Sequence, residues 1–242
     1  KGSCSGTLSC RFHGWTYNSE GKLGLVPQEE QYYERLRGKK NVLSIACDVW
    51  EGVIFINLDP NPKETLLEFL GTDADRFESY PFDNNSSELQ YRGDIKANWK
   101  LVMDAQAETV HASFVHSKSW PVLFTSKDSP FANYLDISFY GKQHSFSLAA
   151  CPDYAPTDVE SLALSLGTAV SSSCDSAAQL CKKLNPSNDP NWSFDGLALF
   201  PNLIIYCLGG VYHTHQFWPL DHRTTNWDLR MHLPVATKPS EL

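Results

Sequence analysis

Residues 98–116 read NWKLVMDAQAETVHASFVH, and this stretch carries the most informative pattern in the chain. Its apolar positions recur at spacings of three and four residues, which predicts a helix from Trp99 to about Val115. Three side chains that can bind metals or protons, those of Glu108, His111 and His116, fall in its second half.

The spacing of these three residues is informative about what they can do together. Glu108 and His111 stand three positions apart, so on a helix they would share one face. His116 follows His111 by five positions, which is about 140° further round an ideal helix. Both histidines can therefore reach one ion only if the helix bends, bulges or ends between them. Two unrelated histidines on an amphipathic helix are the plain alternative.

A second pattern lies near the N-terminus, where residues 10–17 read CRFHGWTY. Cys10 and His13 are three positions apart at the tip of a hairpin-like segment, so both side chains can point at one metal; a chance Cys-x2-His pair is the alternative. Short β-branched runs, among them Val42–Cys47, alternate with turn signals and predict a small antiparallel β module. Pro60 and Pro62 end it, because proline cannot continue a strand ladder.

Outward from these motifs, the rest of the chain predicts a mixture of helix and strand. Residues 63–70 predict a short helix, and the strand candidates lie near residues 89–95, 134–139, 145–150, 197–208, 211–218 and 225–233. Residues 152–195 are rich in Ser, Ala, Asp and Pro and predict a long insertion with about one helix. The sequence thus predicts an α+β fold.

Composition limits the class of protein. The formal charge of −8 argues against nucleic acid, which requires a basic surface. No apolar run approaches the roughly 20 residues of a membrane helix. Seven cysteines at scattered spacings do not suggest a disulfide framework, so we expect a reducing, cytoplasmic compartment.

The two motifs together resemble those of Rieske-type non-haem iron oxygenases, the aromatic-ring-hydroxylating family, in the catalytic (alpha) subunit. Residues 10–27 are similar to the second half of the Rieske [2Fe-2S] motif, and residues 98–116 to the mononuclear-iron motif. They stand in the family's order and at its usual interval. The resemblance implies an N-terminal Rieske [2Fe-2S] antiparallel β domain over residues 1–60. A helix-grip (START-like) catalytic domain over residues 61–242 would follow.

The resemblance also implies a role for each motif residue. Cys10 would bind one iron of the [2Fe-2S] cluster and His13 the other, as in Rieske centres. His111 and His116 would be two members of a 2-His-1-carboxylate triad on a mononuclear Fe(II) that leaves positions open for O₂. Glu108 would hydrogen-bond His111 and, in the family's trimers, reach His13 of a neighbouring subunit.

Several family features are missing or changed. The first Rieske ligand pair would lie before Lys1 and the third iron ligand, a carboxylate, beyond Leu242, so the chain is expected to be a fragment. Asp221 and Asp228 look exposed and are not expected to be ligands. Ala105 replaces an Asn that is usual in the family, which leaves the polarity of the pocket open.

His213 and His215 alternate with apolar residues and so point to one face of a strand. A pair of histidines satisfied within the sheet is the first interpretation, and lining of the substrate pocket is the second.

The implied function is O₂-dependent hydroxylation of an aromatic or other hydrophobic small molecule. Electrons would come from NAD(P)H through a separate ferredoxin or reductase, and the assembly would be a homotrimer or an α3β3 hetero-oligomer. A dioxygenase is the first choice, and a Rieske monooxygenase or O- or N-demethylase on the same scaffold is the second. A non-enzymatic helix-grip ligand-binding module is a remote third.

Overall fold

The computed structural model of the chain describes residues 6–78, 80, 82, 85–119, 123, 129–154, 158, 183–208 and 211–234. The chain forms two compact units, residues 1–65 and 66–242. The predicted domain boundary lies a few residues earlier, between 60 and 61. Among the described residues, no helix is long and apolar enough to cross a membrane.

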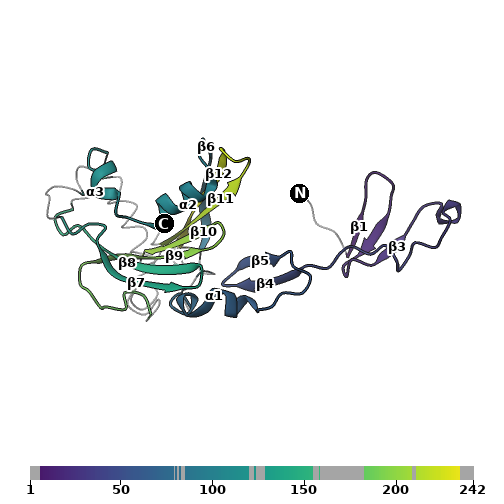
Figure 1. Cartoon of the computed structure of the whole chain (residues 1–242), viewed down its shortest axis with the longest axis horizontal. Coiled ribbons are helices and arrows are strands. Elements are labelled where there is room, and N and C mark those ends of the chain that lie inside the picture. The colour runs from purple at the N-terminus through teal and green to yellow at the C-terminus, as the bar shows by residue number, and fades with distance from the viewer. Residues whose placement is uncertain are drawn as a thin grey trace, which may run out of the picture. The chain divides into compact units, whose positions relative to one another are not determined.

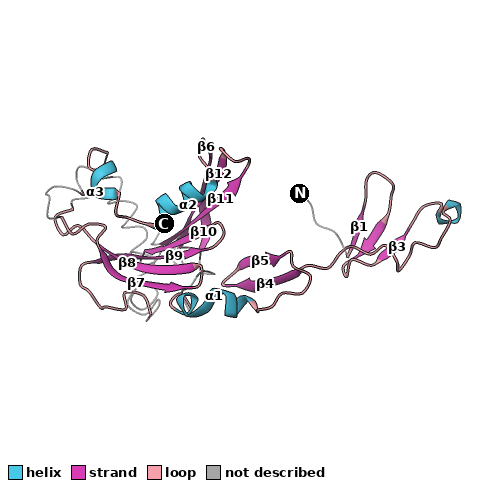
Figure 2. Ribbon diagram, in the orientation of Figure 1, coloured by secondary structure: helices cyan, strands magenta, loops and turns pink. Residues whose placement is uncertain are grey.

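The first unit is built from small antiparallel sheets (Figures 1 and 2). Its elements are β1 (Thr7–Ser9), β2 (Thr16–Asn18), β3 (Leu23–Leu25), the 3-10 turn η1 (Glu29–Gln31), β4 (Ala46–Trp50) and β5 (Val53–Asn57). β1, β2 and β3 form one sheet, and β4 pairs with β5. Leu23, Val26 and Leu36 form a small core with Trp15 and Tyr17 packed against it. The antiparallel β structure predicted for this part of the chain is present.

One predicted strand of this unit is shifted along the chain, since it runs from Ala46 to Trp50. The strand predicted over Val42–Cys47 begins only at Ala46. Val42, before this strand, instead lies beside the turn at Gly21. The carbonyl of Gly21 accepts a hydrogen bond from the backbone N–H of Val42 at 2.9 Å. Asn41 reinforces this path, because its side-chain oxygen accepts from the backbone N–H of Leu23 at 3.1 Å. A tertiary contact therefore overrides the β propensity of the run.

The second unit contains a seven-stranded sheet in which every described neighbour pair is antiparallel. The strand order is β6-β12-β11-β10-β9-β8-β7. The bounds are β6 (Asn85–Ile95), β7 (Tyr134–Tyr140), β8 (Gln143–Ala149), β9 (Trp192–Leu199), β10 (Leu203–Leu208), β11 (Val211–Pro219) and β12 (Thr225–Pro234). The helices are α1 (Leu66–Asp75), α2 (Trp99–Ala107) and α3 (Ala112–Val115). The mixed α+β architecture predicted for this part is confirmed.

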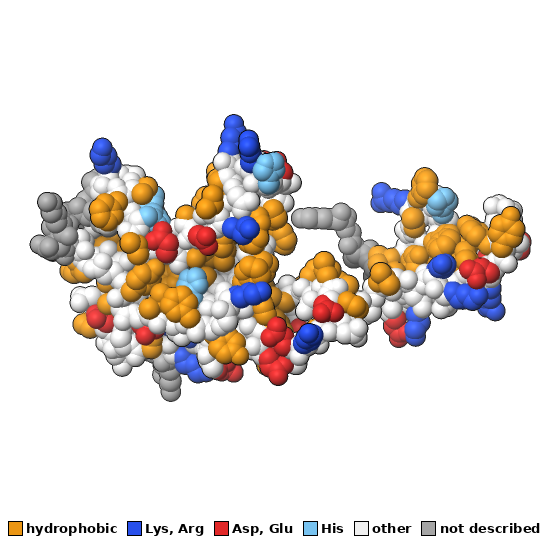
Figure 3. Space-filling model, viewed as in Figure 1, with side chains coloured by type: hydrophobic (Ala, Val, Ile, Leu, Met, Phe, Trp, Pro, Cys, Tyr) orange, Lys and Arg blue, Asp and Glu red, His pale blue; other side chains and the backbone are white. Residues whose placement is uncertain are grey.

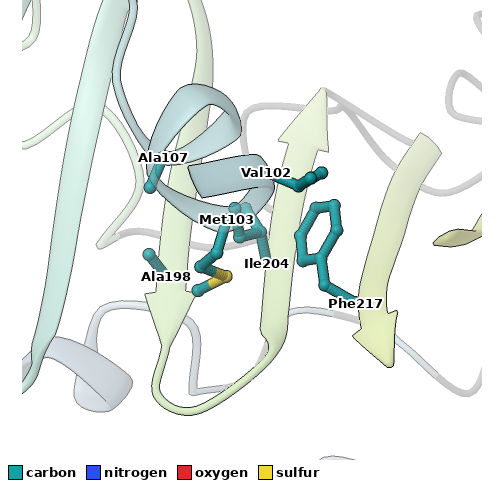
Figure 4. Packing of buried hydrophobic residues seen from close by; sticks show 6 residues of the cluster. All are labelled: Val102, Met103, Ala107, Ala198, Ile204 and Phe217. Atoms are coloured by element: carbon teal, nitrogen blue, oxygen red, sulfur yellow. The ribbon is translucent and has the colours of Figure 1, made fainter. Parts of the chain in front are cut away.

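Helix α2 lies on one face of this sheet. It begins at Asn98, whose side chain accepts from the backbone N–H of Lys100 at 3.1 Å and so caps the helix. Its inner face packs on the middle of the sheet, as Figure 4 shows. The buried cluster consists of Val102, Met103 and Ala107 from α2 and Ala198, Ile204 and Phe217 from β9, β10 and β11. This packing fixes where the end of α2 stands above the strands.

Helix α1 lies against the opposite face. Successive residues of a strand point to opposite sides of a sheet. In β8 the ring of His144 contacts the carbonyl of Ala107 at the end of α2, whereas the next residue, Ser145, bonds Asp73 and Arg76 at the end of α1. Arg76 is buried and forms ion pairs with Asp195 and Asp136, a network that ties α1 to β7 and β9. The sheet is therefore held between two helical layers.

The helix predicted over residues 63–70 is present but shifted, since α1 runs from Leu66 to Asp75 with a break at Gly71. The φ of 66° there, and the ring of Tyr140 within 2.4 Å of any added Cβ, require glycine. The insertion predicted over residues 152–195 falls mostly on residues 155–157 and 159–182, which lie outside the described residues.

Candidate metal centre

The helix predicted from Trp99 to about Val115 is not continuous. α2 ends at Ala107, Glu108 adopts an extended conformation (φ −132°, ψ 160°), and a separate single turn, α3, follows. His111 precedes this turn as its N-cap and His116 ends it as its C-cap. The prediction that Glu108 and His111 share a helix face is therefore wrong. The break still satisfies the requirement that the chain bend before both histidines can face one point.

Strands of the sheet fix the position of the break. Thr109 lies at its centre: its backbone N–H donates to the phenol oxygen of Tyr134 at 3.2 Å, and its hydroxyl donates to the carbonyl of Ala132 at 2.8 Å. These partners stand at the start of β7 and just before it. Because the backbone at Thr109 bonds outside the helix, α2 cannot continue through it.

Two further side chains bind the last carbonyls of α2, which have no partner within a helix that stops there. The hydroxyl of Tyr206, on β10, donates to the carbonyl of Gln106. A ring nitrogen of His144, on β8, lies 3.0 Å from the carbonyl of Ala107. Burial raises the pKa of Tyr206, so its hydroxyl stays protonated and able to donate. We call Tyr134, His144 and Tyr206 the α2 clamp.

The extended conformation brings the carboxylate of Glu108 onto His111 at two points. One oxygen contacts Nδ1 of the His111 ring, and the other accepts from the backbone N–H of His111 at 3.2 Å. Partial burial opposes ionisation, but the hydrogen bonds from His111 outweigh it and hold the pKa of Glu108 below its usual range. An ionised carboxylate on Nδ1 fixes the tautomer and orientation of the ring and leaves Nε2 as the metal-binding atom.

The two histidines lie close together. Their ring centroids are 5.3 Å apart with an interplanar angle of 66°. Imidazole nitrogens bind transition metals at about 2.0–2.1 Å, so rings at this separation can reach one ion. Nδ1 of His116 lies 3.3 Å from the hydroxyl of Ser119, a second oxygen that orients a ring. This donor set fits two members of a facial triad, with an outer hydrogen-bond partner on each ring.

No third ligand joins them among the described residues, where no group of three or more metal-binding side chains is found. Asp221 is exposed and accepts from the backbone N–H of Arg223 at 2.6 Å, so it closes a turn. Asp228 was predicted to be exposed, and this is wrong: it is 5% exposed and bonds the guanidinium groups of Arg92 and Arg230. The carboxylates of Asp221 and Asp228 are thus both engaged in contacts within the fold.

Cys10 and His13 lie at the tip of the β1–β2 hairpin in the first unit. The tip is closed by hydrogen bonds from Cys10 N to the Trp15 carbonyl (2.7 Å) and from Gly14 N to the Cys10 carbonyl (2.9 Å). Backbone hydrogen bonds from His13 and Phe12 lower the pKa of the Cys10 thiol. A thiolate held by backbone N–H groups fits an iron–sulfur ligand, whose potential depends on such bonds.

Apolar surface accompanies both candidate ligand groups. Exposed hydrophobic side chains occur over each unit (Figure 3). Phe12, between Cys10 and His13, and Phe114, between His111 and His116, are each 84% exposed, so apolar surface borders both sets of predicted ligands. Ala105, which replaces an Asn that is usual in the family, lies on the exposed side of α2.

The residues that sequence reasoning missed are the α2 clamp and Ser119. Each residue of the α2 clamp lies between 25 and 100 positions from the carbonyl or N–H that it binds. No local sequence pattern therefore predicts these contacts. Ser119, by contrast, follows His116 by three positions and could have been noticed as a nearby hydroxyl.

Comparison with known proteins gives a consistent family match. A family model described as the ring hydroxylating alpha subunit (catalytic domain) matches residues 82–241, more than half of the chain. The carnitine monooxygenase oxygenase subunit of Escherichia coli (strain K12) is 25% identical over 118 residues, which are 48% of this chain and 31% of that protein. The anthranilate 1,2-dioxygenase large subunit of Acinetobacter baylyi is 30% identical over 116 residues, 45% of this chain and 24% of that protein.

A solved structure of a quaternary ammonium Rieske monooxygenase has a TM-score of 0.69 and 16% identity. The match covers 99% of this chain and 56% of the chain in that structure. At this identity the likeness shows the fold. The chain thus spans about a quarter to a third of these curated relatives and about half of the solved structure.

Proposed function

The chain belongs to the Rieske oxygenase family, through the catalytic domain of its ring-hydroxylating alpha subunits, and we propose that the protein hydroxylates a small organic substrate with O₂ at a mononuclear iron. The observation that carries the proposal is the arrangement at the end of α2. His111 and His116 lie 5.3 Å apart, and the carboxylate of Glu108 is bound to the Nδ1 of His111. A pair of satisfied core histidines would be fully buried, whereas His111 and His116 are both partly exposed and a carboxylate orients the His111 ring.

Each residue has a definable task in this proposal. His111 and His116 would hold the iron through ring nitrogens, and Glu108 would keep a proton on Nδ1 of His111 so that Nε2 remains the electron-pair donor. The third ligand is proposed to be a carboxylate beyond Leu242. Iron(II) in a 2-His-1-carboxylate site supplies open positions at which O₂ is activated.

The first unit is proposed to be part of a Rieske [2Fe-2S] domain, with Cys10 and His13 as one ligand to each iron. The backbone hydrogen bonds from His13 and Phe12 that lower the pKa of the Cys10 thiol support this, since the thiolate is the form that binds metal. Electrons would arrive from NAD(P)H through a ferredoxin or reductase in the cytoplasm. In a homotrimer or α3β3 assembly, Glu108 would join His111 to His13 of a neighbouring subunit. The second unit would be the helix-grip domain.

The identity of the substrate and the number of oxygen atoms inserted are further proposals. Dioxygenation of an aromatic ring is the first choice, supported by similarity to an anthranilate 1,2-dioxygenase. Monooxygenation or demethylation is the second, supported by similarity to a carnitine monooxygenase. Turnover under ¹⁸O₂ separates them, because a dioxygenase product carries two labelled oxygen atoms and a monooxygenase product carries one.

The central test removes the histidines. His111→Ala and His116→Ala should each lose one iron per subunit and all oxygenation, because a single remaining histidine cannot hold the ion. The visible absorption and low-field electron paramagnetic signal of the [2Fe-2S] centre should stay unchanged, which controls for folding. Near wild-type turnover in either variant would disprove the site, and an iron-free wild type would favour a ligand-binding module.

A further inference from the structure

A buried pair of nitrogen-bearing rings lies beneath α2 and is not used by the metal centre. His215, on β11, is only 7% exposed, and neither of its ring nitrogens has a hydrogen-bond partner among the described residues. Trp227, on β12, is partly buried, and its indole N–H also lacks a partner there. An unsatisfied buried polar atom costs about 1–3 kcal/mol, so three in one place call for an explanation.

The two rings face the same region. Trp227 pairs directly with Phe217 across β11 and β12, and Phe217 belongs to the buried cluster under α2. Residues 215 and 217 share a face of β11, so His215 points the same way. The ring centroids of His215 and Trp227 are 5.6 Å apart. The two rings are therefore neighbours on the sheet face that α2 covers.

The chemistry of the pair is that of a neutral donor. Burial, together with the neighbouring His213, lowers the pKa of His215 to about 3, so the imidazole is uncharged at neutral pH. A neutral imidazole has one N–H donor and one acceptor nitrogen, and indole can only donate. Two N–H donors in an apolar setting match an oxygen that accepts two hydrogen bonds, as a carbonyl or carboxylate oxygen does.

The pair also lies next to the segment that leads into the candidate metal centre. The ring of Tyr206 packs edge-on against His215 at 5.0 Å. The hydroxyl of the same tyrosine binds the carbonyl of Gln106, two positions before Glu108. A group held by His215 would therefore sit beneath the end of α2, on the sheet face that α2 covers.

We propose that His215 and Trp227 form a polar subsite that binds a carbonyl or carboxylate oxygen of the organic substrate. The inference rests on the proposed oxygenase function and adds a substrate class to it: molecules that carry an oxygen acceptor, in preference to bare hydrocarbons. It also reverses the first interpretation of His215 as a histidine satisfied within the sheet, because no such partner is present among the described residues.

Two series of matched probes test this by equilibrium calorimetry on the full-length, metal-loaded protein without O₂. One series is benzoate, benzamide and toluene; the other is glycine betaine and tetramethylammonium. In at least one series, the acceptor-bearing probe should bind wild type at least tenfold more tightly than its methyl counterpart. Benzoate against benzamide separates a carboxylate from a carbonyl requirement.

Two variants remove the donors separately. His215→Leu removes both ring nitrogens, and Trp227→Phe keeps an aromatic ring but removes the N–H. Each variant should lower the affinity for an uncharged acceptor-bearing probe roughly tenfold, and for a carboxylate probe up to about 100-fold. The affinity for the methyl counterpart should stay within twofold of the wild-type value. His222→Leu, in an exposed turn, is the control and should bind as wild type does.

Either of two results would overturn the subsite: no preference for an acceptor in both series, or a preference that survives in both variants. Its failure is separable from failure of the oxygenase proposal. Binding is measured without turnover, whereas the oxygenase proposal depends on iron content and labelled product. A protein with iron and turnover but no acceptor preference fails the subsite alone.

Discussion

At the residue scale, Glu108 is the side chain whose chemistry can be most sharply tested. Glu108→Gln keeps the shape and an acceptor oxygen but removes the charge that orients His111. If Glu108 only supports a metal ligand, this substitution should lower the affinity for iron roughly 10–100-fold. If Glu108 also joins two subunits, we expect the iron-saturated variant to keep both iron centres and accept electrons, yet to fail in passing them to the mononuclear site.

Stopped-flow absorbance of the [2Fe-2S] centre during a single turnover measures this transfer, and metal analysis gives the iron content. Glu64→Gln, an exposed carboxylate before α1, is the matched control. Reoxidation of the cluster at the wild-type rate in Glu108→Gln would leave this carboxylate with a supporting role only.

Asp228 gives a prediction about pH. Partial burial opposes its ionisation, but hydrogen bonds from Gln90, Arg230 and Arg92 outweigh this and hold its pKa below the usual 3.8. A carboxyl whose pKa is lowered by folding contributes stability above its unfolded pKa and loses it as pH falls. We expect Asp228→Asn to reduce the free energy of unfolding by about 2–3 kcal/mol at pH 7, and by much less near pH 3. Urea unfolding at both pH values measures this; an equal loss at both would contradict it.

At the element scale, the break between α2 and α3 is the feature that brings His111 and His116, the proposed iron ligands, together. Tyr206→Phe removes the hydroxyl that binds the Gln106 carbonyl and leaves that buried carbonyl without this donor. We expect a loss of about 1–3 kcal/mol in the free energy of unfolding. Because the clamp also positions Glu108, iron affinity should fall several-fold as well.

Chemical denaturation and iron titration together check this prediction. Tyr91→Phe, on β6 and 57% exposed, is the control and should change neither quantity. A variant that loses stability yet binds iron as tightly as wild type would show that Tyr206 packs α2 without positioning the metal centre.

At the scale of the whole molecule, the proposed electron path joins two copies of the chain. His13→Ala should lack a sound [2Fe-2S] centre and His111→Ala a sound mononuclear site, so each oligomer alone should be inactive. In mixed oligomers an intact [2Fe-2S] cluster on one subunit can face an intact mononuclear iron site on the next, so some turnover should return. Co-expression with two affinity tags isolates the mixed species. Verified mixed oligomers with no turnover would place the transfer within one chain.

The sequence by itself determined the features that depend on near neighbours. The types and spacing of Cys10, His13, Glu108, His111 and His116 needed no structure, and neither did the start of the helix at Trp99. Strand candidates in the second unit followed from alternation of apolar and polar residues, which is a local property of a half-buried strand. The family resemblance rested on the same short motifs, and the match over residues 82–241 confirmed it.

Only the tertiary structure decided where α2 ends and which polar groups are buried. Helical periodicity continues past Ala107, yet the helix stops because Tyr134 and Tyr206, from strands 25 and 100 positions away, take the hydrogen bonds at its end. Asp228 looked exposed because its partner Arg92 lies 136 positions earlier in the chain. Each hydrogen bond between segments far apart in the sequence contributes about 1 kcal/mol net, and no short window of sequence contains both partners.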